Sequence, residues 1–440
     1  MQTIAVLGMG RIGLPTAATF ANAGLDVICV DIDAKKVSAI QDGYSGVKEK
    51  GLGDMLRAAI SAGRLRIDTE EANAVQESDA VIICVPTPLR NGKLDSRYLS
   101  SALDMTAEGM HRGLLIIIQS TLPPRTTEDF VKPRFERNHF VVDEDFFLAY
   151  VPERLALGNA LKEYACNPRI IGGVSPKSTR MAAELYRRIS REIFETDSTT
   201  AELIKLAENT FRDLNIAYAN LLALISEKLH VDVAEVVRLA NTHPRVNIHK
   251  PGPGVGGPCL TKDPYLLLES VKDRLNVDLI DDARKMNEYM PHHVVRIVRK
   301  ALRQADKRPD ISQIVVLGTA YKGDVDDVRE SPAKIIITEL LELGCKVTAY
   351  DPYTSESFGA KYADNLYRAT KDADLILIVT DHSEFKSVNL RKIGKLMRPH
   401  PILVDSRRIV SADEAVEAGL EYYGIGVGES VSGSHYRKGR

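Results

Sequence analysis

One cysteine of the chain stands in a setting that suits chemistry. Cys259 lies in a loop of residues 251–264 (the cysteine loop) that holds four glycines and four prolines. Glycine lets a backbone approach a ligand closely and adopt positive φ, and proline stiffens the path between. Apolar residues are too few here for a strand or a helix. The thiol is therefore either a nucleophile or a structural accident.

A lysine and an asparagine are the next residues with chemical potential. Lys205 and Asn209 are four residues apart in a predicted helix of residues 201–229, so they share one face of it. A lysine on a mostly apolar helix usually extends its ammonium group to water. The alternative is that both side chains point into the site that holds Cys259.

The N-terminal segment carries a glycine-rich turn in the context of a nucleotide-binding fold. Residues 4–7 predict a strand, residues 8–13 read GxGxxG, residues 14–23 predict a helix, and residues 27–31 predict a second strand ending in an acid. The first glycine permits the tight turn, the second lets pyrophosphate approach, and the third lets the helix pack closely. The acid favours NAD over NADP. The predicted NAD contacts here are Gly8, Gly10, Arg11, Ile12, Gly13 and Asp31.

Further polar residues follow three apolar runs that predict buried parallel strands. These runs are residues 80–85, 114–118 and 147–151. Ligands of open α/β sheets bind beyond the carboxyl ends of the strands, which places Thr87, Thr121 and Glu153 near a cofactor or substrate. Either threonine could instead cap a following helix, and Glu153 could instead form an ion pair with Arg154.

The middle of the chain predicts helices. Residues 199–202 match a capping box, which predicts the start of the long helix at about residue 201. Two more helices are predicted over residues 265–275 and 279–303. Histidines occur here too, but without other ligands at metal-binding spacing, so no metal site is predicted.

The pattern of the first domain then returns without its glycine fingerprint. Residues 314–318 and 347–351 repeat the first two strands, further strands are predicted over 374–380 and 402–405, and the first turn lacks the GxGxxG spacing. A second NAD is therefore not expected. Cations near the strand ends suit a phosphorylated or nucleotide ligand, although each could be a surface charge: Lys322, Arg329, Arg407 and Arg408.

These patterns predict an α/β chain of two doubly wound Rossmann-like domains joined by a central helical domain with one long helix. The boundaries are 1–198, 199–306 and 307–440.

The net charge of −2 gives no general attraction to nucleic acid, and no apolar run is long enough to span a membrane. Five dispersed cysteines without a CxxC pair argue against disulfides and zinc, and the first residues already read as a strand. A cytoplasmic protein is expected.

The motifs resemble those of the UDP-glucose/GDP-mannose dehydrogenase family, the nucleotide-sugar 6-dehydrogenases, over nearly the whole chain. Six motifs occur in the family's order: residues 8–15, 120–121, 152–153, 202–212, 256–263 and 321–331. Residues 243–247 and 251–257 look most like members that oxidise UDP-N-acetyl-D-mannosamine. Pro258 and the pair Thr261 and Lys262 depart from what those members often carry. UDP-N-acetylglucosamine and UDP-glucose are the alternative substrates.

The resemblance implies a four-electron oxidation of a sugar C6 alcohol to a carboxylate with two NAD+. It implies that Cys259 binds the aldehyde covalently, that Lys205 and Asn209 stabilise the oxyanion, and that Thr121, Glu153 and Asp263 hold a water. Thr87, Thr121 and Arg329 are added to the cofactor contacts. The implied substrate contacts are Glu153, Arg154, Lys205, Asn209, Arg245, Gly256, Lys322 and Arg407. A homodimer or higher homo-oligomer through the long helix is also implied.

Two alternative functions, one of a non-enzyme and one of a different dehydrogenase class, compete with this interpretation. A non-catalytic nucleotide-sensing protein could keep both Rossmann-like folds, but it would not need Cys259, Lys205, Asn209 and Asp263 together. A two-electron hydroxyacid dehydrogenase would share the three-part layout and the helical lysine and asparagine, yet it needs no cysteine. One NADH per substrate would indicate that class, and two would indicate the cysteine route.

Overall fold

The computed structural model describes residues 2–42, 46–47, 49–137, 139–155, 158, 160–269, 271, 275 and 277–427. The chain forms two compact units. The first comprises Met1–Asn209 and Lys262–Asn276, and the second comprises Thr210–Thr261 and Val277–Arg440. The long helix α9 (Ser198–Leu229) contributes residues to both. Domain boundaries at residues 198 and 306 stay a prediction, and residues 428–440 of the predicted last domain lie outside the described part.

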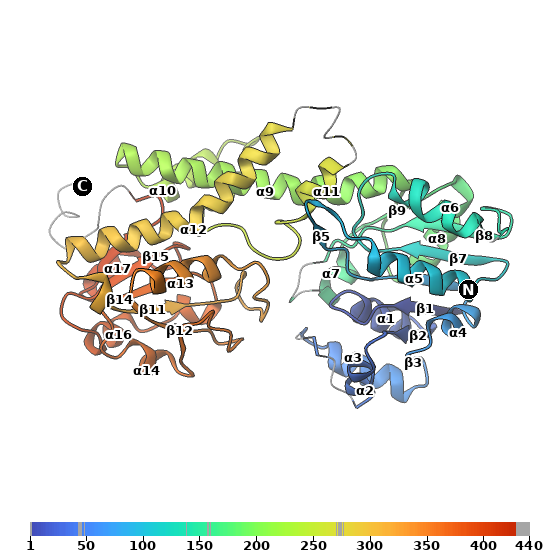
Figure 1. The fold of residues 1–440 in the computed structure, drawn as a ribbon, viewed down its shortest axis with the longest axis horizontal. Helices are drawn as coiled ribbons and strands as arrows, with labels where there is room; N and C mark the ends of the chain where they lie inside the picture. Colours follow the sequence, from blue (N-terminus) through green and yellow to red (C-terminus); the bar gives the residue numbers. More distant parts are fainter. Residues whose placement is uncertain are drawn as a thin grey trace. The chain divides into compact units, whose positions relative to one another are not determined.

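The first unit is built on an eight-stranded sheet with the strand order β10-β9-β8-β7-β4-β1-β2-β3 (Figure 1). Its pairs are parallel except β8 with β9. The order reverses between β1 and β4, where the first strand has neighbours on both sides. The strands are β1 (Thr3–Leu7), β2 (Asp26–Val30), β3 (Leu65–Asp68), β4 (Ala80–Ile83), β7 (Leu114–Ile118), β8 (Phe146–Tyr150), β9 (Arg169–Gly173) and β10 (Ile193–Asp197). Of these, β3, β9 and β10 were not predicted.

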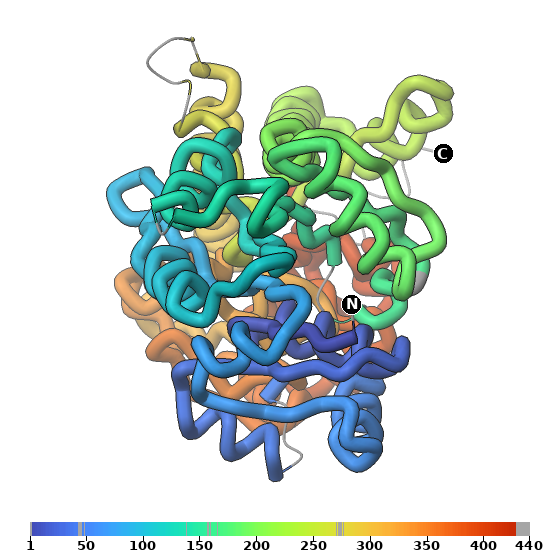
Figure 2. Tube along the Cα trace, turned by 90° about the vertical axis from the view of Figure 1, so that its right-hand side faces the viewer, coloured from blue at the N-terminus to red at the C-terminus, as the bar shows by residue number. Residues whose placement is uncertain are grey.

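Both faces of this sheet are covered by helices, which explains why its strands read as continuous apolar runs. Ile4 and Val6 of β1 enter one core, while Ala5 and Leu7 enter the core on the opposite face. The first core is closed by α1 (Gly13–Asn22), α2 (Ala34–Gln41), α3 (Leu52–Ser61) and α8 (Pro176–Tyr186). The second is closed by α4 (Glu71–Gln76), α5 (Arg97–Glu108), the π-helix η1 (Thr127–Val131) and α6 (Lys132–Glu136). Figure 2 traces the part of this unit before Asn209 in blue to green.

The second unit contains a parallel six-stranded sheet of order β13-β12-β11-β14-β15-β16. Its strands are β11 (Gln313–Leu317), β12 (Lys346–Tyr350), β13 (Lys361–Tyr362), β14 (Leu375–Ile378), β15 (Ile402–Asp405) and β16 (Glu421–Gly424). One face packs on α12 (Asp278–Gln304) and α13 (Pro332–Glu342); the other packs on α14 (Leu366–Thr370), α16 (Leu390–Leu396) and α17 (Ala412–Glu417). Strand β16, which follows the predicted strand over 402–405, was not predicted.

The predicted helices agree closely with the observed ones, apart from one start and one end. Helix α9 begins at Ser198, and Asp197 Oδ1 accepts a 2.8 Å hydrogen bond from the Thr200 N–H. The predicted capping box is wrong because Glu202 accepts hydrogen bonds from Thr127 instead of closing back on its own helix. Helix α11 (Asp263–Glu269) ends earlier than predicted; residues 270 and 272–274 of that prediction lie outside the described part. The predicted fold class is confirmed.

Candidate functional site

The glycine turn after β1 has the geometry that a dinucleotide requires. Gly8 adopts φ of 101°, which favours glycine, and its N–H donates to Val30 O at 2.7 Å. A Cβ on Gly13 would lie 1.8 Å from Gly8 O, so the helix can pack on the turn only without a side chain. A Cβ on Gly10 would meet nothing within 4 Å, which leaves open space beside the backbone. The turn thus fits a pyrophosphate at the start of α1.

Asp31 closes this turn from the end of β2. Its Oδ2 accepts from Met9 N–H at 2.8 Å and from Lys36 Nζ at 2.7 Å, and its Oδ1 accepts from Asp33 N–H at 3.0 Å. Burial acts to raise the pKa of Asp31, but the Lys36 hydrogen bond and the backbone donors outweigh it and lower the pKa. The carboxylate is therefore ionised and retains acceptor capacity for ribose hydroxyls.

The other predicted cofactor residues of the first unit lie in three places. Arg11 and Ile12 are half-buried within the turn. Thr87 is buried after β4, where its carbonyl oxygen and hydroxyl accept hydrogen bonds from Lys262 Nζ at 2.9 and 3.3 Å. Thr121 is half-buried just after β7.

The predicted catalytic side chains of the first unit form hydrogen-bonded pairs along α9. Asn209 Nδ2 donates to Asp263 Oδ2 at 2.6 Å, and both residues are buried. Lys262 Nζ lies 3.5 Å from the other carboxylate oxygen of Asp263. One turn earlier on α9, Lys205 Nζ donates to the backbone carbonyl oxygen of Glu153. Lys205 and Asn209 therefore face polar groups, and not only water.

The Glu153 carboxylate points into a buried network that the sequence did not reveal. Gln119 Nε2 lies 2.7 Å from its Oε2, the Tyr164 hydroxyl lies 3.1 Å from the same oxygen, and Arg169 Nη1 lies 3.5 Å from Oε1. The alternative ion pair with Arg154 is absent from the described ion pairs. Arg154 pairs with Glu208 at 2.6 Å and only its N–H reaches Glu153.

Residues 251–262 of the cysteine loop are irregular, as predicted, whereas Asp263 and Pro264 begin helix α11; Cys259 is exposed. Gly254 and Gly257 adopt φ of 119° and 86°. Gly257 N–H donates to Arg329 O at 3.1 Å, and a Cβ on Gly256 would lie 2.5 Å from Glu330 O. The glycines therefore let the loop press against the segment after β11 while the thiol stays at the surface.

Behind the loop, buried amides connect two helices to it. Asn220 of α9 accepts from Gly252 N–H at 2.9 Å and donates to Asn287 of α12 at 3.0 Å. Asn287 donates in turn to Asp213 at 2.8 Å, and Arg284 pairs with the same carboxylate at 2.7 Å. None of these four side chains was singled out from the sequence. The loop is thus anchored to a buried polar network.

Cations surround the exposed thiol loop within the second unit. Arg329 pairs with Asp327 at 2.6 Å; this hydrogen bond raises the pKa of Arg329, and the charge of Cys259 acts in the same direction. A guanidinium near a cysteine favours the nucleophilic thiolate. Arg407 donates to Tyr321 O at 3.2 Å, and its Nη1 would lie 3.2 Å from a Cβ on Gly252.

The remaining predicted cations differ in their surroundings. Lys322 and Arg245 are exposed, and the Arg245 N–H donates to His243 Nδ1 at 3.3 Å. Arg408 instead forms a structural ion pair with Asp232 at 2.7 Å. Arg408 is therefore less suited to bind a ligand than Lys322 and Arg245.

The turn after β11 differs from the turn after β1 because it lacks the GxGxxG spacing. Asp351, at the position that corresponds to Asp31, is buried. Its Oδ2 accepts hydrogen bonds from Thr319 N–H at 2.7 Å and from His382 Nε2 at 3.0 Å. A Cβ on Gly318 would lie 2.3 Å from Thr380 Cβ. The Asp351 carboxylate thus accepts hydrogen bonds from residues of its own domain.

The other cysteines differ from Cys259 in their surroundings. Burial raises the pKa of Cys29, Cys84 and Cys345, so these thiols stay protonated. Cys166 is exposed and ends helix α7 (Ala160–Cys166). Cys259 is therefore the cysteine that combines exposure with a glycine-built loop.

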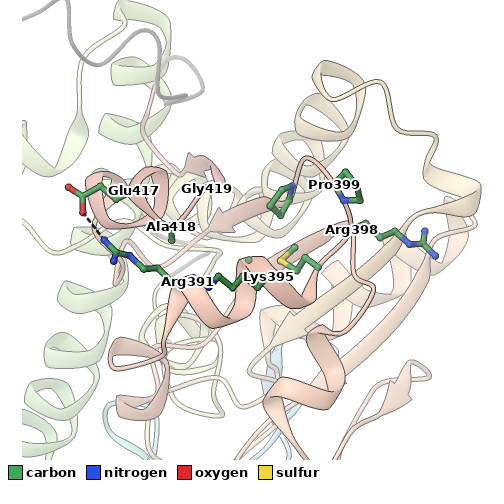
Figure 3. A pocket seen from close by; sticks show the side chains of 10 residues that line it. Arg391, Lys395, Arg398, Pro399, Glu417, Ala418 and Gly419 are labelled. Carbon is green, nitrogen blue, oxygen red and sulfur yellow. Dashed lines mark ion pairs between the residues drawn. The ribbon is translucent and has the colours of Figure 1, made fainter.

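Three further features of the described residues bear on function. None of their helices is both long and apolar enough to cross a bilayer. No group of three or more His, Cys, Asp or Glu residues among them is arranged to hold a metal ion. A surface hollow of about 590 Å³ is lined by none of the predicted site residues, and its Arg391 lies 3.8 Å from Glu417, while Arg398 points away (Figure 3).

Comparison with known proteins matches three family models in chain order. They describe the NAD binding domain (residues 2–190), the central domain (199–289) and the UDP binding domain (315–412) of the UDP-glucose/GDP-mannose dehydrogenase family. A relative named UDP-N-acetyl-D-mannosamine dehydrogenase, from Pyrococcus horikoshii, is 44% identical over 97% of this chain and 99% of its own.

Solved structures agree with this result. A UDP-D-ManNAc dehydrogenase from Pyrococcus horikoshii has a TM-score of 0.91 at 43% identity and covers 97% of this chain and 100% of its own. The UDP-N-acetyl-mannosamine dehydrogenase Cap5O from Staphylococcus aureus has a TM-score of 0.85 at 38% identity, covering 97% and 98%. The chain therefore belongs to the UDP-glucose/GDP-mannose dehydrogenase family and uses NAD as its cofactor.

Proposed function

We propose that this protein oxidises the C6 hydroxyl of UDP-N-acetyl-D-mannosamine to the carboxylate, using two NAD+. The observation that carries the proposal is the exposed Cys259 on a glycine-built loop beside Arg329. The names of the most similar relatives favour this sugar. A two-electron dehydrogenase needs no such thiol, and neither does a nucleotide sensor.

Each oxidation removes one hydride and one proton from the sugar. NAD+, when bound at the glycine turn, supplies the hydride acceptor. The alcohol becomes an aldehyde in the first oxidation, and the Cys259 sulfur then adds to C6 to form a thiohemiacetal. The second oxidation converts this adduct to a thioester. Water adds to the thioester carbon and the thiolate leaves, which releases the carboxylate and regenerates the cysteine.

We assign the polar groups on α9 and α11 to charge stabilisation and proton transfer. Lys205 and Asn209 are hydrogen-bond donors for the oxyanion that develops at C6. Asp263 orients Asn209 through their 2.6 Å hydrogen bond and, with Thr121, holds the water that accepts the proton.

We assign the nucleotide part of the substrate to cations of the chain. Lys322 and Arg407 suit the two phosphates, because guanidinium and ammonium groups bind phosphate oxygens strongly. Gly256 lets the substrate approach the loop backbone, while Arg154 and the exposed Arg245 are assigned to the sugar. Arg329 is assigned to the cofactor.

We further propose that the protein is a homodimer through α9. Part of the helix within the second unit exposes large apolar side chains at helical spacing: Phe211, Tyr218, Leu221, Ile225 and Leu229. An apolar stripe of this kind on a helix marks an interaction surface. A second copy of the chain packed on this stripe would bury these side chains. Light scattering should then give twice the mass of one chain.

A panel of UDP-sugars tests the substrate. We expect NADH formation with UDP-N-acetyl-D-mannosamine at a kcat/KM at least about tenfold above that with UDP-N-acetylglucosamine and UDP-glucose. A higher kcat/KM with either of the other two sugars would transfer the assignment to that sugar. No NADH with any of them would contradict the proposal.

A further inference from the structure

Arg169 is a fully buried cation outside the proposed catalytic set. It begins β9 with 0% exposure, and its Cζ lies 4.1 Å from the centroid of the Tyr164 ring. Its Nη1 approaches Glu153 Oε1 at 3.5 Å, while Nε and Nη2 have no hydrogen-bond partner among the described residues. Such an incompletely satisfied buried cation contributes little to stability, so another reason for its presence is needed.

The carboxylate of Glu153, which faces Arg169, has protein donors at both of its oxygen atoms. Glu153 Oε1 accepts from Arg154 N–H at 2.7 Å and faces Arg169, and Oε2 accepts from Gln119 at 2.7 Å and from Tyr164 at 3.1 Å. Burial, followed by the charge of Glu153, raises the pKa of Tyr164 well above its usual value, so the phenol remains a donor. Four donors use the lone pairs of a carboxylate. Glu153 is therefore poorly placed to hold a water with this group.

The peptide group that follows Glu153 connects this network to Lys205. A trans peptide is planar, and its N–H and C=O point in opposite directions. The Arg154 N–H points inward to Glu153 Oε1, so the carbonyl oxygen of Glu153, in the same peptide, points the other way. Lys205 Nζ donates to that carbonyl oxygen. Fixing the carboxylate therefore fixes the acceptor of the lysine.

We propose that Arg169 is a positioning residue for the reaction, which holds the Glu153 carboxylate and thereby orients the Glu153 carbonyl oxygen that places the Lys205 ammonium group. The inference rests on the proposed function of Lys205. It assigns Glu153 to placing the lysine through its backbone, in place of binding a water through its carboxylate.

The same network also reaches the cofactor helix, so the test must separate chemistry from NAD binding. Thr16 of α1 donates to Gln119 Oε1 at 3.2 Å and contacts the Tyr164 hydroxyl. A change at Arg169 could therefore act through α1 on the cofactor. Calorimetric titration with NAD+ distinguishes this route, since Lys205 acts on the sugar.

The experiment compares Arg169→Met, Arg169→Lys and Arg187→Met in the full chain with UDP-N-acetyl-D-mannosamine. Arg187 is a matched control because it pairs with Glu195 at 2.7 Å at the surface of the same unit. We expect Arg169→Met to lower kcat about tenfold or more, with KM for the sugar and the Kd for NAD+ within about threefold of wild type. Arg169→Lys should recover part of kcat, and Arg187→Met should match wild type.

A double variant separates positioning from folding. Glu153→Gln/Arg169→Met leaves no buried charge unpaired, so it should keep the Tm near that of wild type while kcat stays low. The proposal is overturned by wild-type kcat in Arg169→Met or in the folded double variant, by loss of NAD+ affinity alone, or by failure of both variants to fold. Wild type and Arg187→Met should form two NADH per sugar; if they do not, the proposed function fails, whatever Arg169 does.

Discussion

Asn209 Nδ2 lies 2.6 Å from Asp263 Oδ2, so a buried hydrogen bond joins helix α9 to the first residue of α11. Asp263 follows Cys259 by four residues in the chain. A carboxylate that accepts from an amide nitrogen fixes which way the amide points. The pair therefore gives Asn209 a defined orientation before any substrate binds.

Replacing Asn209 should reduce turnover more than binding. Asn209→Ala removes a proposed oxyanion donor, so we expect kcat to fall by about 100-fold while the Kd for NAD+ changes little. Steady-state NADH formation and calorimetry measure the two quantities. Asn73→Ala, which removes an exposed amide on α4, should behave like wild type. Unchanged kcat in Asn209→Ala would remove this residue from the site.

The glycine turn offers a matched pair of substitutions. Gly13→Ala places a Cβ 1.8 Å from Gly8 O, so we expect a lower Tm and no NAD+ binding. Gly10→Ala meets only open space in the free protein, so its Tm should stay near that of wild type, while the added methyl group occupies the space of the pyrophosphate and weakens NAD+ binding. Wild-type NAD+ affinity in Gly10→Ala would contradict the proposed placement.

The hydrogen bonds that Asn220 makes behind the cysteine loop should matter to both stability and activity. Asn220→Ala leaves Gly252 N–H and Asn287 Oδ1 without their partner, which should lower the free energy of unfolding by about 1–3 kcal/mol and reduce kcat. Urea denaturation and NADH formation measure these effects. Asn241→Ala, which removes two surface hydrogen bonds with Ile248, is the control. If Asn220→Ala lost stability but kept full kcat, the anchor would not position the thiol.

Glu202 should make stability depend on pH near neutrality. Burial raises the pKa of Glu202 from 4.5 to about 7, against hydrogen bonds from Thr127 and Arg125. Because the folded pKa lies above the unfolded one, this contribution to stability is present below pH 4.5 and is lost as pH rises through about 7.

The variant Glu202→Gln, whose side chain does not titrate, isolates this pH dependence of stability. Between pH 5.5 and 8.5 the wild type should lose about 2 kcal/mol more unfolding free energy than Glu202→Gln, as measured by urea denaturation. Glu71→Gln is a useful comparison, because Glu71 is another buried carboxyl whose pKa is raised, by burial and by the charge of Asp31. Identical pH dependence in wild type and Glu202→Gln would contradict an elevated pKa.

The elements with strong local patterns could be predicted from the sequence. Residues 4–7 and 114–118 are buried on both faces of a sheet, so their apolar runs indicated strands directly. The glycine turn was predictable because its spacing follows from one local geometry. The cysteine loop was predictable because its composition excludes regular structure.

The remaining features depend on contacts between distant residues. Glu202 matched a capping box, but a hydrogen bond to Thr127, 75 residues away, took its carboxylate. Arg169 has no motif around it, and only its place at the start of an apolar run ending in two glycines hinted at burial. Asn220 and Asn287 lie on different helices, so their hydrogen bond follows from packing that no spacing encodes.

The most direct test of the cysteine route counts NADH formed per UDP-N-acetyl-D-mannosamine consumed to completion with excess NAD+. Wild type should form two NADH and the uronic acid. Cys259→Ser should stall before the carboxylate while its Kd for NAD+ stays near that of wild type. One NADH per sugar in the wild type, or full conversion to the uronic acid by Cys259→Ser, would contradict the account.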